Sequence, residues 1–292
     1  MEDQKYVIIT SARNEEAYIK KTIESVIRQT ILPKRWVIVS DGSTDRTDEI
    51  VRRFEASYDF IQLLRTEHSG GYSFASKAHA IRAGLAQLND IEYNFIGNLD
   101  ADISFEPSYY ETVLAKFKEN SKLGITGGVI FEDLNGKLIR QFTRPWSVAG
   151  AIQMFRRQCY EDIGGYIPLP GGGIDVVAEI MARMQGWEVR CFPEIKTVHN
   201  RYVGKGKNNI LVAKFRFGRR EYSYGNHPLY EIAKCLLRVG ERPYVIGSFL
   251  RGCGYFLSFL HMRPHEVPNE VVEHLRREQI QRLLSVFRKK RN

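Results

Sequence analysis

The first hundred residues alternate short β-branched runs with segments whose apolar residues recur at helical spacing. This alternation predicts βαβ units, because parallel strands are usually joined by crossover helices. The sequence therefore predicts an α/β fold with a mostly parallel sheet flanked by helices. The predicted strands are residues 5–10, 35–40, 60–64 and 93–99, and the predicted helices are residues 17–29, about 45–57 and 76–88.

Beyond this region the pattern changes. Residues 124–131 and 137–142 flank the dipeptide Asn135-Gly136, which is typical of hairpin turns, so they predict a β-hairpin. Towards the C-terminus the sequence becomes helical and rich in aromatic residues and arginine. We expect one α/β domain over residues 1–210 and a helical region over residues 211–292.

Acidic turns directly follow two of the predicted strands. Asp41 follows the second strand, and Asp100 and Asp102 follow the fourth. Ligands of parallel sheets bind beyond the carboxyl ends of the strands, so we expect these carboxylates to face one crevice. Two carboxylates one residue apart can share Mg²⁺ or Mn²⁺ with a diphosphate. The alternative is an acidic turn that only caps a helix.

Three segments resemble a known family. Residues 6–16 (YVIITSARNEE), 23–30 (IESVIRQT) and 37–47 (VIVSDGSTDRT) are similar, in this order, to the nucleotide-binding half of glycosyltransferase family 2. The resemblance covers about residues 5–200. It implies a GT-A fold, which is Rossmann-like, a nucleotide-sugar donor and inversion at the anomeric carbon.

The resemblance also implies roles for individual residues. Asp41 would bind the base, typically uracil, whose imide N–H needs a hydrogen-bond acceptor; an Asx turn that caps a helix is the alternative. Asp102 would ligate the metal, and Asp100 would contact the ribose or the metal. The other nucleotide-binding residues that we expect are Thr10, Ala12, Arg13, Glu15 and Ala101.

Asp175 is the candidate general base. The stretch from Gly173 to Trp187 resembles the family's Glu-Asp pair followed by a helix that ends in Gly-Trp, with Ile174 in place of the glutamate. The aligned aspartate would deprotonate the acceptor hydroxyl, and a helix N-cap is the alternative role. His199 resembles a third metal or diphosphate ligand of the family; a packed or surface histidine is the alternative.

Basic residues near these motifs are candidates for phosphate contacts. Lys77 and Arg82 follow a glycine-containing segment, and each is either a phosphate ligand or an exposed helix charge. Arg201, Lys205 and Lys207 lie in a loop that could close over the diphosphate.

The formal net charge is +9, which favours anionic partners. Residues 288–291 form a basic tail, and Arg216, Arg219 and Arg220 form a second cluster. Residues 245–260 are apolar and aromatic with a single charge, which indicates either a core helix or an interfacial membrane patch. The sequence shows no helix-turn-helix or zinc-finger pattern, so we expect no nucleic-acid partner.

Localisation is expected to be cytoplasmic and peripheral on the inner face of the cell membrane. The sequence has no run of 18 or more apolar residues and no visible signal peptide. The four cysteines are far apart and lack a zinc-type spacing, so they indicate reduced thiols.

The predicted activity is that of an inverting, metal-dependent glycosyltransferase. It would move a sugar from a nucleotide donor, with UDP expected, to a glycan or polyprenyl-linked acceptor in cell-surface polysaccharide synthesis. The alternatives are a nucleotidyltransferase and an inactive membrane-bound scaffold protein of the same fold.

Overall fold

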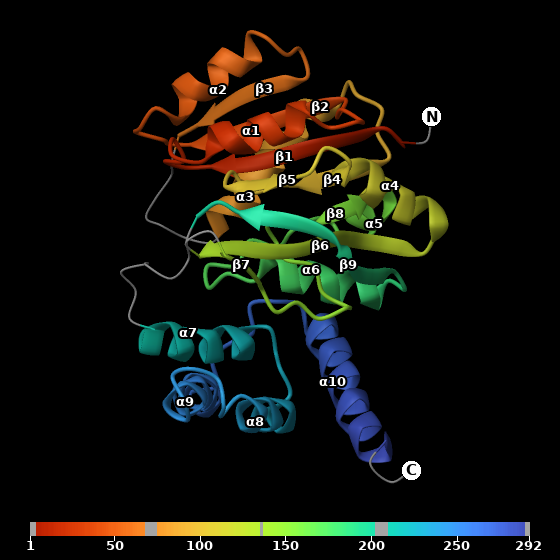
Figure 1. Ribbon diagram of the computed structural model, residues 1–292. Coiled ribbons are helices and arrows are strands. Elements are labelled where there is room, and N and C mark those ends of the chain that lie inside the picture. Colours follow the sequence, from red (N-terminus) through yellow and green to blue (C-terminus); the bar gives the residue numbers. More distant parts are fainter. Residues whose placement is uncertain (1–3, 68–74, 135–136, 202–209, 290–292) are drawn as a thin grey trace. The chain divides into compact units, whose positions relative to one another are not determined.

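The computed structural model describes residues 4–67, 75–134, 137–201 and 210–289. Within these residues nine strands form one sheet in the order β3-β2-β1-β4-β8-β6-β9-β5, with β7 paired to β6 (Figure 1). The strands are β1 (Tyr6–Ala12), β2 (Arg35–Asp41), β3 (Ile61–Thr66), β4 (Phe95–Asn98), β5 (Ile103–Phe105), β6 (Leu123–Leu134), β7 (Lys137–Arg140), β8 (Met154–Arg156) and β9 (Glu188–His199).

Helices lie between these strands and after them in the chain. They are α1 (Ile19–Ile27), α2 (Thr47–Glu55), α3 (Ala75–Leu85), α4 (Tyr109–Glu119), α5 (Arg157–Asp162), α6 (Ile174–Met184), α7 (Ile210–Ser223), α8 (Pro228–Leu237), α9 (Ile246–Leu260) and α10 (Asn269–Lys289), with a 3₁₀ turn at Ala86–Leu88.

The parallel part of the sheet fixes where a site can form. β1 pairs in parallel with both β2 and β4, β2 pairs in parallel with β3, and β6 pairs in parallel with β9. The carboxyl ends of neighbouring parallel strands therefore lie at one edge, where Asp41 of β2 is opposite Thr66 of β3. This confirms the α/β prediction and places the turns that carry Asp41 and Asp100 at the same edge of the sheet.

Helices on both faces explain the strand sequences. Val7, Ile8 and Ile9 of β1 have no exposed surface, which is the pattern of a strand buried on both sides. Helix α3 packs directly on β1 and β2 at Gly84, where a Cβ atom would come within 2.8 Å of Ile9 Cγ2. A side chain there would push the helix off the sheet.

The rest of the sheet is antiparallel. β8 joins the two parallel parts by pairing with β4 and β6, and β5 pairs with β9. β6 and β7 form the predicted hairpin; its Asn135-Gly136 turn lies outside the described residues. β9 continues through Pro193 and delivers His199 to its last position, so it is longer than a strand of ordinary length.

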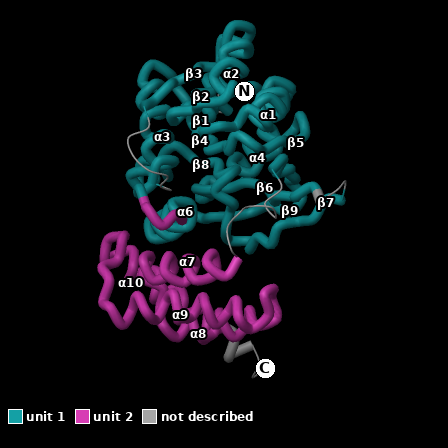
Figure 2. The backbone as a smooth tube through the Cα atoms, turned by 90° about the vertical axis from the view of Figure 1, so that its left-hand side faces the viewer, with its two compact units in different colours: residues 1–168, 174–205 teal, residues 169–173, 206–292 magenta. Residues whose placement is uncertain are grey.

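The chain divides into two compact units (Figure 2). The first comprises residues 1–168 and 174–205, and the second comprises residues 169–173 and 206–292. Within the second unit, the short segment 169–173 contacts the helices through the Tyr224 hydroxyl, which donates a hydrogen bond to the Gly172 carbonyl at 3.3 Å. In the described residues no helix is long and apolar enough to cross a membrane.

Helices α7, α8 and α9 of the second unit pack through small and charged side chains. Glycines bring α7 and α9 together, because a Cβ atom on Gly218 would lie 1.9 Å from the Arg251 carbonyl oxygen. Arg251 Nε donates to Glu221 Oε2 at 2.6 Å, and Lys234 also pairs with Glu221. Glu231 Oε1 lies 3.4 Å from Arg251 Nε. The interior of this unit is thus built around buried ion pairs.

Candidate active site

The carboxyl edge of the sheet gathers an acidic residue, a histidine and an arginine. Asp102 follows β4 and is largely buried. Its Oδ2 lies 3.2 Å from His199 Nε2 and accepts a hydrogen bond from Arg201 Nε at 2.9 Å. The structure holds this arrangement through the backbone, because Asn200 N donates to the Asp102 carbonyl at 2.7 Å and His199 is opposite Ile103 in the β5–β9 ladder.

Arg201 joins Asp102 to a second acid. Its Nη2 forms an ion pair with Glu15 Oε2, so one guanidinium connects the loop after β1 to the turn after β4. The pKa of Glu15 is raised to about 7, mainly by burial and also by the negative charges of Asp102 and Asp100, against the opposing effect of Arg201. The guanidinium carbon of Arg201 also lies 4.9 Å from the ring centre of Tyr18.

Asp102 and His199 shift each other's pKa in opposite directions. Burial acts to raise the pKa of Asp102, but the hydrogen bonds from His199 and Arg201 hold that pKa below its ordinary value. Burial acts to lower the pKa of His199, but Asp102 holds it above its ordinary value. Nδ1 of His199 is buried and has no hydrogen-bond partner within the described residues.

This pair fits a divalent cation. Asp102 Oδ2 and His199 Nε2 lie 3.2 Å apart and so bring a carboxylate and an imidazole together, and both groups are ligands that divalent cations accept. Across the described segments, no group of three or more His, Cys, Asp and Glu residues could form a complete metal site. Asp102 and His199 would thus hold the cation together with phosphate oxygens and water, as is usual for Mg²⁺; imidazole also suits Mn²⁺.

The residues expected around the nucleoside differ in their exposure. Asp41 is the last residue of β2 and is half-buried, and its Oδ1 accepts a hydrogen bond from the Thr66 hydroxyl at 3.4 Å. Arg13 is exposed in the loop after β1. Ala12 and Ala101 are buried. Thr10 has no exposed surface and its Oγ1 accepts a hydrogen bond from Trp36 Nε1 at 2.9 Å, so its side chain supports the sheet and does not face a ligand.

Two loops at this edge are tied together by their motif residues. Thr44 N donates to Asn14 Oδ1 at 2.8 Å, and Glu15 N donates to Thr47 Oγ1 at 2.8 Å. Asn14 has a φ of 55°, a left-handed conformation that asparagine tolerates better than most residues. The Asn-Glu-Glu and Asp-Gly-Ser-Thr-Asp-Arg-Thr segments therefore fix each other, which is a structural role that the sequence analysis did not assign.

Only one of the two phosphate candidates on α3 lies near the acids. Lys77 Nζ forms an ion pair with Asp100 Oδ1 and donates to the Gly150 carbonyl at 3.2 Å. Arg82 is exposed in the last turn of α3, and its charge acts on Tyr160 of α5. The glycine segment before Lys77, and Lys205 and Lys207, lie outside the described residues.

Asp175 lies in the first turn of α6, which begins at Ile174, so it is within the helix and not at the N-cap. The positive end of the helix dipole favours a carboxylate at this position. Its side chain is half-buried and packs against the chain at Gly150. The Gly150 carbonyl in turn accepts the bonds of Lys77 and Asn98, and the Ala151 carbonyl accepts from Asp100 N at 2.9 Å. The segment around Gly150 therefore links the candidate base to the acidic turn.

Glu179, one turn after Asp175, is buried and acts inside the fold. Its Oε1 accepts hydrogen bonds from Val148 N at 2.6 Å, Ser147 Oγ at 3.2 Å and Gln153 Nε2 at 3.3 Å. Burial raises the pKa of Glu179 to about 8. With 3% of its surface exposed, Glu179 cannot take a proton from an acceptor, and it instead anchors the segment around Gly150 to α6.

The fold is that of the GT-A glycosyltransferases, as comparison with solved structures shows. S. aureus TarS 1–349 in complex with UDP-GlcNAc has a TM-score of 0.56 at 15% identity, covering 86% of this chain and 71% of that one. The mannosyltransferase PcManGT from Pyrobaculum calidifontis, in complex with GDP-Man and Mn²⁺, has a TM-score of 0.55 at 17% identity and coverages of 88% and 74%. GalNAc-T7 with UDP, GalNAc and Mn²⁺ has a TM-score of 0.59 at 14% identity and coverages of 89% and 56%.

Residues 7–173 match the model of Glycosyl transferase family 2. Because the match covers more than half of the chain, this protein belongs to that family, and the resemblance found in its motifs is confirmed. Membership of this family, whose curated relatives are named as glycosyltransferases and synthases, sets aside the nucleotidyltransferase alternative.

Curated relatives share part of the chain. The poly-beta-1,6-N-acetyl-D-glucosamine synthase of Staphylococcus epidermidis is 28% identical over 203 residues, which is 63% of this chain and 45% of the relative. The glycosyltransferase GlyA of Streptococcus pneumoniae is 32% identical over 117 residues, which is 40% of this chain and 16% of the relative. This chain therefore spans less than half the length of these relatives.

Proposed function

We propose that this protein transfers a sugar from a UDP-linked donor to a glycan or a polyprenyl-linked acceptor, with inversion at the anomeric carbon. The observation that carries the proposal is the convergence of Asp41, Asp102 and His199 at one edge of the parallel sheet. Relatives and neighbours support it: a synthase of a β-linked glucosamine polymer matches in sequence, and structures of the same fold hold UDP-GlcNAc or UDP.

Donor binding is assigned to the loops at the carboxyl edge. The Asp41 carboxylate accepts the imide N–H of uracil, which selects UDP over CDP. Arg13 lines the nucleoside pocket, Lys77 contacts the diphosphate, and Arg82 is kept as a second phosphate candidate. Ala12, Ala101 and Asp100 contribute backbone and side-chain contacts to the nucleoside, and Thr10 supports the strand beneath it.

Asp102 and His199 would hold the divalent cation, and a bound cation would stabilise the negative charge of the departing diphosphate. Asp175 removes the proton from an acceptor hydroxyl as that oxygen attacks the anomeric carbon. The bond from the anomeric carbon to the diphosphate oxygen breaks in the same displacement, so the configuration inverts. Glu179 and Gly150 keep the carboxylate of Asp175 in position.

The reaction is proposed to take place at the inner face of the cell membrane, with the protein attached peripherally and contributing to a cell-surface polysaccharide. The supporting observation is charge. Residues 206–292 hold 17 lysine and arginine residues against 7 aspartate and glutamate residues, so this segment carries the basic surplus of the whole chain. An anionic leaflet attracts such a segment.

Calorimetry with UDP, GDP and CDP, each with Mn²⁺ and with EDTA, tests the proposal. We expect UDP to bind most tightly and Mn²⁺ to strengthen its binding. Asp41→Ala should weaken UDP binding about tenfold or more, because it removes a charged hydrogen-bond acceptor. Asp59→Ala, which removes an exposed carboxylate after α2, is the matched control and should bind UDP normally. Tighter binding of GDP, or UDP binding indifferent to EDTA, would refute the assignment.

A further inference from the structure

The polarity of helix α9 is inverted relative to an ordinary surface helix. Its buried residues include Ser248, Arg251 and Ser258, whereas its exposed side chains include Phe249, which is 68% exposed, and Leu260, which is 71% exposed. A helix on a soluble protein buries its apolar stripe and exposes its polar one. The outward face of α9 therefore matches an apolar environment, not water.

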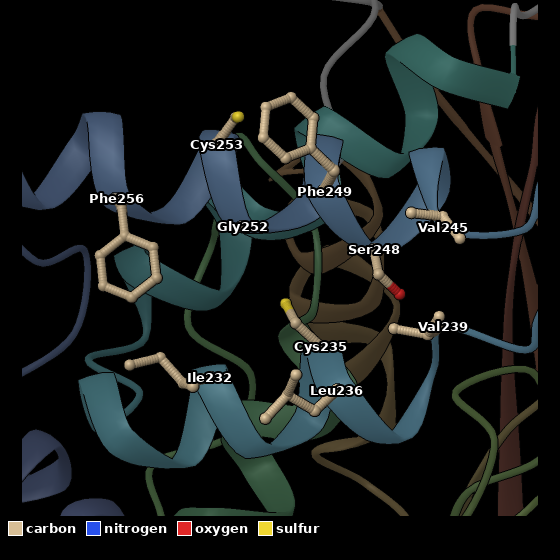
Figure 3. Close-up of a pocket in the computed structure, with 10 residues that line it drawn as sticks. All are labelled: Ile232, Cys235, Leu236, Val239, Val245, Ser248, Phe249, Gly252, Cys253 and Phe256. Atoms are coloured by element: carbon tan, nitrogen blue, oxygen red, sulfur yellow. The ribbon is translucent and has the colours of Figure 1, made fainter.

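Helix α8 shows the same inversion. Its buried residue is Glu231, with no exposed surface, while Leu236 is 69% exposed and Leu237 is 86% exposed. The two helices border an open groove of about 430 Å³ whose surface is almost wholly apolar, with Leu236 and Phe249 on its walls (Figure 3). Contiguous exposed apolar surface of this kind marks an interaction site.

The inward side of the same helices has the features of helices that pack in lipid. Small residues, Gly218 and Gly254, allow α7 and α9 to approach closely, and the charged side chains of Glu221 and Arg251 pair with each other in the interior. Helices in bilayers use small residues at their contacts and turn ionisable groups away from the lipid. No described helix is long and apolar enough to cross a membrane, so an insertion of this face would be shallow.

The charge of this segment favours a bilayer over a second copy of the chain as the partner of the apolar face of α8 and α9. Arginines frame α9 at both ends, Arg242 before it and Arg263 after it, and both are exposed. The segment 206–292 has ten more basic than acidic residues, 17 against 7. Two copies placed face to face would bring two positively charged segments together, and their electrostatic repulsion is unfavourable. An anionic leaflet attracts basic residues and accepts an apolar face at its boundary.

We propose that the outward face of α8 and α9 inserts into the headgroup–acyl boundary of an anionic bilayer, with Leu236, Leu237, Phe249 and Leu260 entering the apolar layer. The proposal specifies the surface behind the membrane placement proposed above, but it does not depend on the sugar-transfer chemistry. Vesicle binding is measured without a donor, so its failure and a failure of the proposed function are distinguishable.

Flotation with phosphatidylcholine vesicles, with and without about 30% phosphatidylglycerol, tests the proposal. The wild-type protein should float with the anionic vesicles. Leu236→Glu and Phe249→Glu should each weaken binding about tenfold or more. Each substitution removes an apolar contact with the acyl layer and adds a negative charge that the anionic leaflet repels. Leu138→Glu is the matched control, because Leu138 is 54% exposed on β7 in the other unit, and it should bind like wild type.

A second measurement locates the face directly. The native tryptophans are at positions 36, 146 and 187, outside the helices concerned. Phe249→Trp should gain fluorescence quenching by brominated lipids that the wild-type protein lacks. Three outcomes would each overturn the proposal. The wild-type protein could fail to float, or the glutamate variants could float normally while salt alone releases the protein. The third is a dimer in solution that Phe249→Glu dissociates.

Discussion

Gly150 and Asp175 are in such close contact that a single added carbon would collide with the candidate base. A Cβ atom on Gly150 would lie 2.8 Å from both Cβ and Oδ2 of Asp175. Gly150→Ala should therefore displace Asp175, and a displacement of about 1 Å can cost about 10²-fold in rate.

Transfer rates and melting temperatures of Gly150→Ala and Gly240→Ala test this relationship. Within the described residues, a Cβ atom on Gly240 would come within 4 Å of nothing beyond its neighbours in the chain, so its substitution is a control for the loss of a glycine. Overpacking at Gly150 should also cost about 1–3 kcal/mol of stability. A Gly150→Ala protein that transfers sugar at the wild-type rate would show that Asp175 needs no exact placement.

Asp175→Asn should remove transfer and spare donor binding. The amide keeps the size of the side chain but cannot accept a proton at neutral pH, and general-base catalysis contributes about 10²–10⁴-fold. Asp175 lies in the first turn of α6, and if it only stabilised the start of this helix, Asn would substitute well and turnover would change little. Turnover and UDP affinity, measured on the same preparation, separate the two roles. Near-normal turnover would eliminate Asp175 as the base.

Arg201 should compete with a metal for Asp102. The Arg201 guanidinium contacts both Asp102 and Glu15, so Arg201→Ala removes the positive charge that compensates these two carboxylates. The variant protein should therefore bind free Mn²⁺ more tightly than wild type. Asp102→Ala should bind Mn²⁺ more weakly and lose the effect of Mn²⁺ on UDP binding. Titration of Mn²⁺ followed by electron paramagnetic resonance measures both effects without turnover.

Arg53→Ala is the control for that titration, because Arg53 forms an exposed pair with Glu49 on α2. It should leave Mn²⁺ affinity unchanged. Equal affinity in Arg201→Ala and wild type would mean that the guanidinium does not oppose the cation. Full activity of the wild-type protein in excess EDTA would remove the metal from the reaction.

Glu179→Gln should stabilise the protein at high pH. The pKa of Glu179 is raised to about 8 by burial, so the folded state binds a proton that the unfolded state releases near pH 4.5. The stabilisation from this group is complete below that lower pH and is lost as pH rises through about 8, and the full loss is on the order of 5 kcal/mol. The amide resembles the protonated acid and does not titrate.

Melting temperatures from pH 5 to pH 8.5 check this expectation. The variant and wild type should melt alike at pH 5, and the variant should melt higher at pH 8.5. Glu161→Gln, which changes an exposed acid paired with Arg157, should show no such gain. A wild-type protein that stays more stable than Glu179→Gln at pH 8.5 would show that its carboxylate is stabilised in its ionised form.

The parallel half of the fold could be read from the sequence because its strands carry their own signal. Continuous apolar runs at β1 and β2 are buried on both faces, and acidic turns follow β2 and β4. β5 and β8 were not predicted, because strands of three residues are too short to show a periodicity. Pro193 also hides the continuity of β9, since proline is unusual inside a strand.

The site could be predicted only where a motif is local. The Asp-x-Asp sequence identifies Asp102 as a metal-ligand candidate, but nothing in it indicates that Arg201 lies between Asp102 and Glu15, which are 99 and 186 residues away from it. The role of Gly150 was missed for a similar reason. Its contact with Asp175 arises from packing, and a glycine between two alanines has no distinctive pattern.

The short segment of residues 169–173 has a practical consequence for protein engineering. It lies directly before the helix that carries Asp175, yet it rests on Tyr224 of the C-terminal helices. Truncation after residue 205 would remove that tyrosine and leave the loop unsupported. Transplanting the C-terminal helices onto another transferase would likewise require the loop, so the exchangeable module is discontinuous in sequence and cannot be cut out at one boundary.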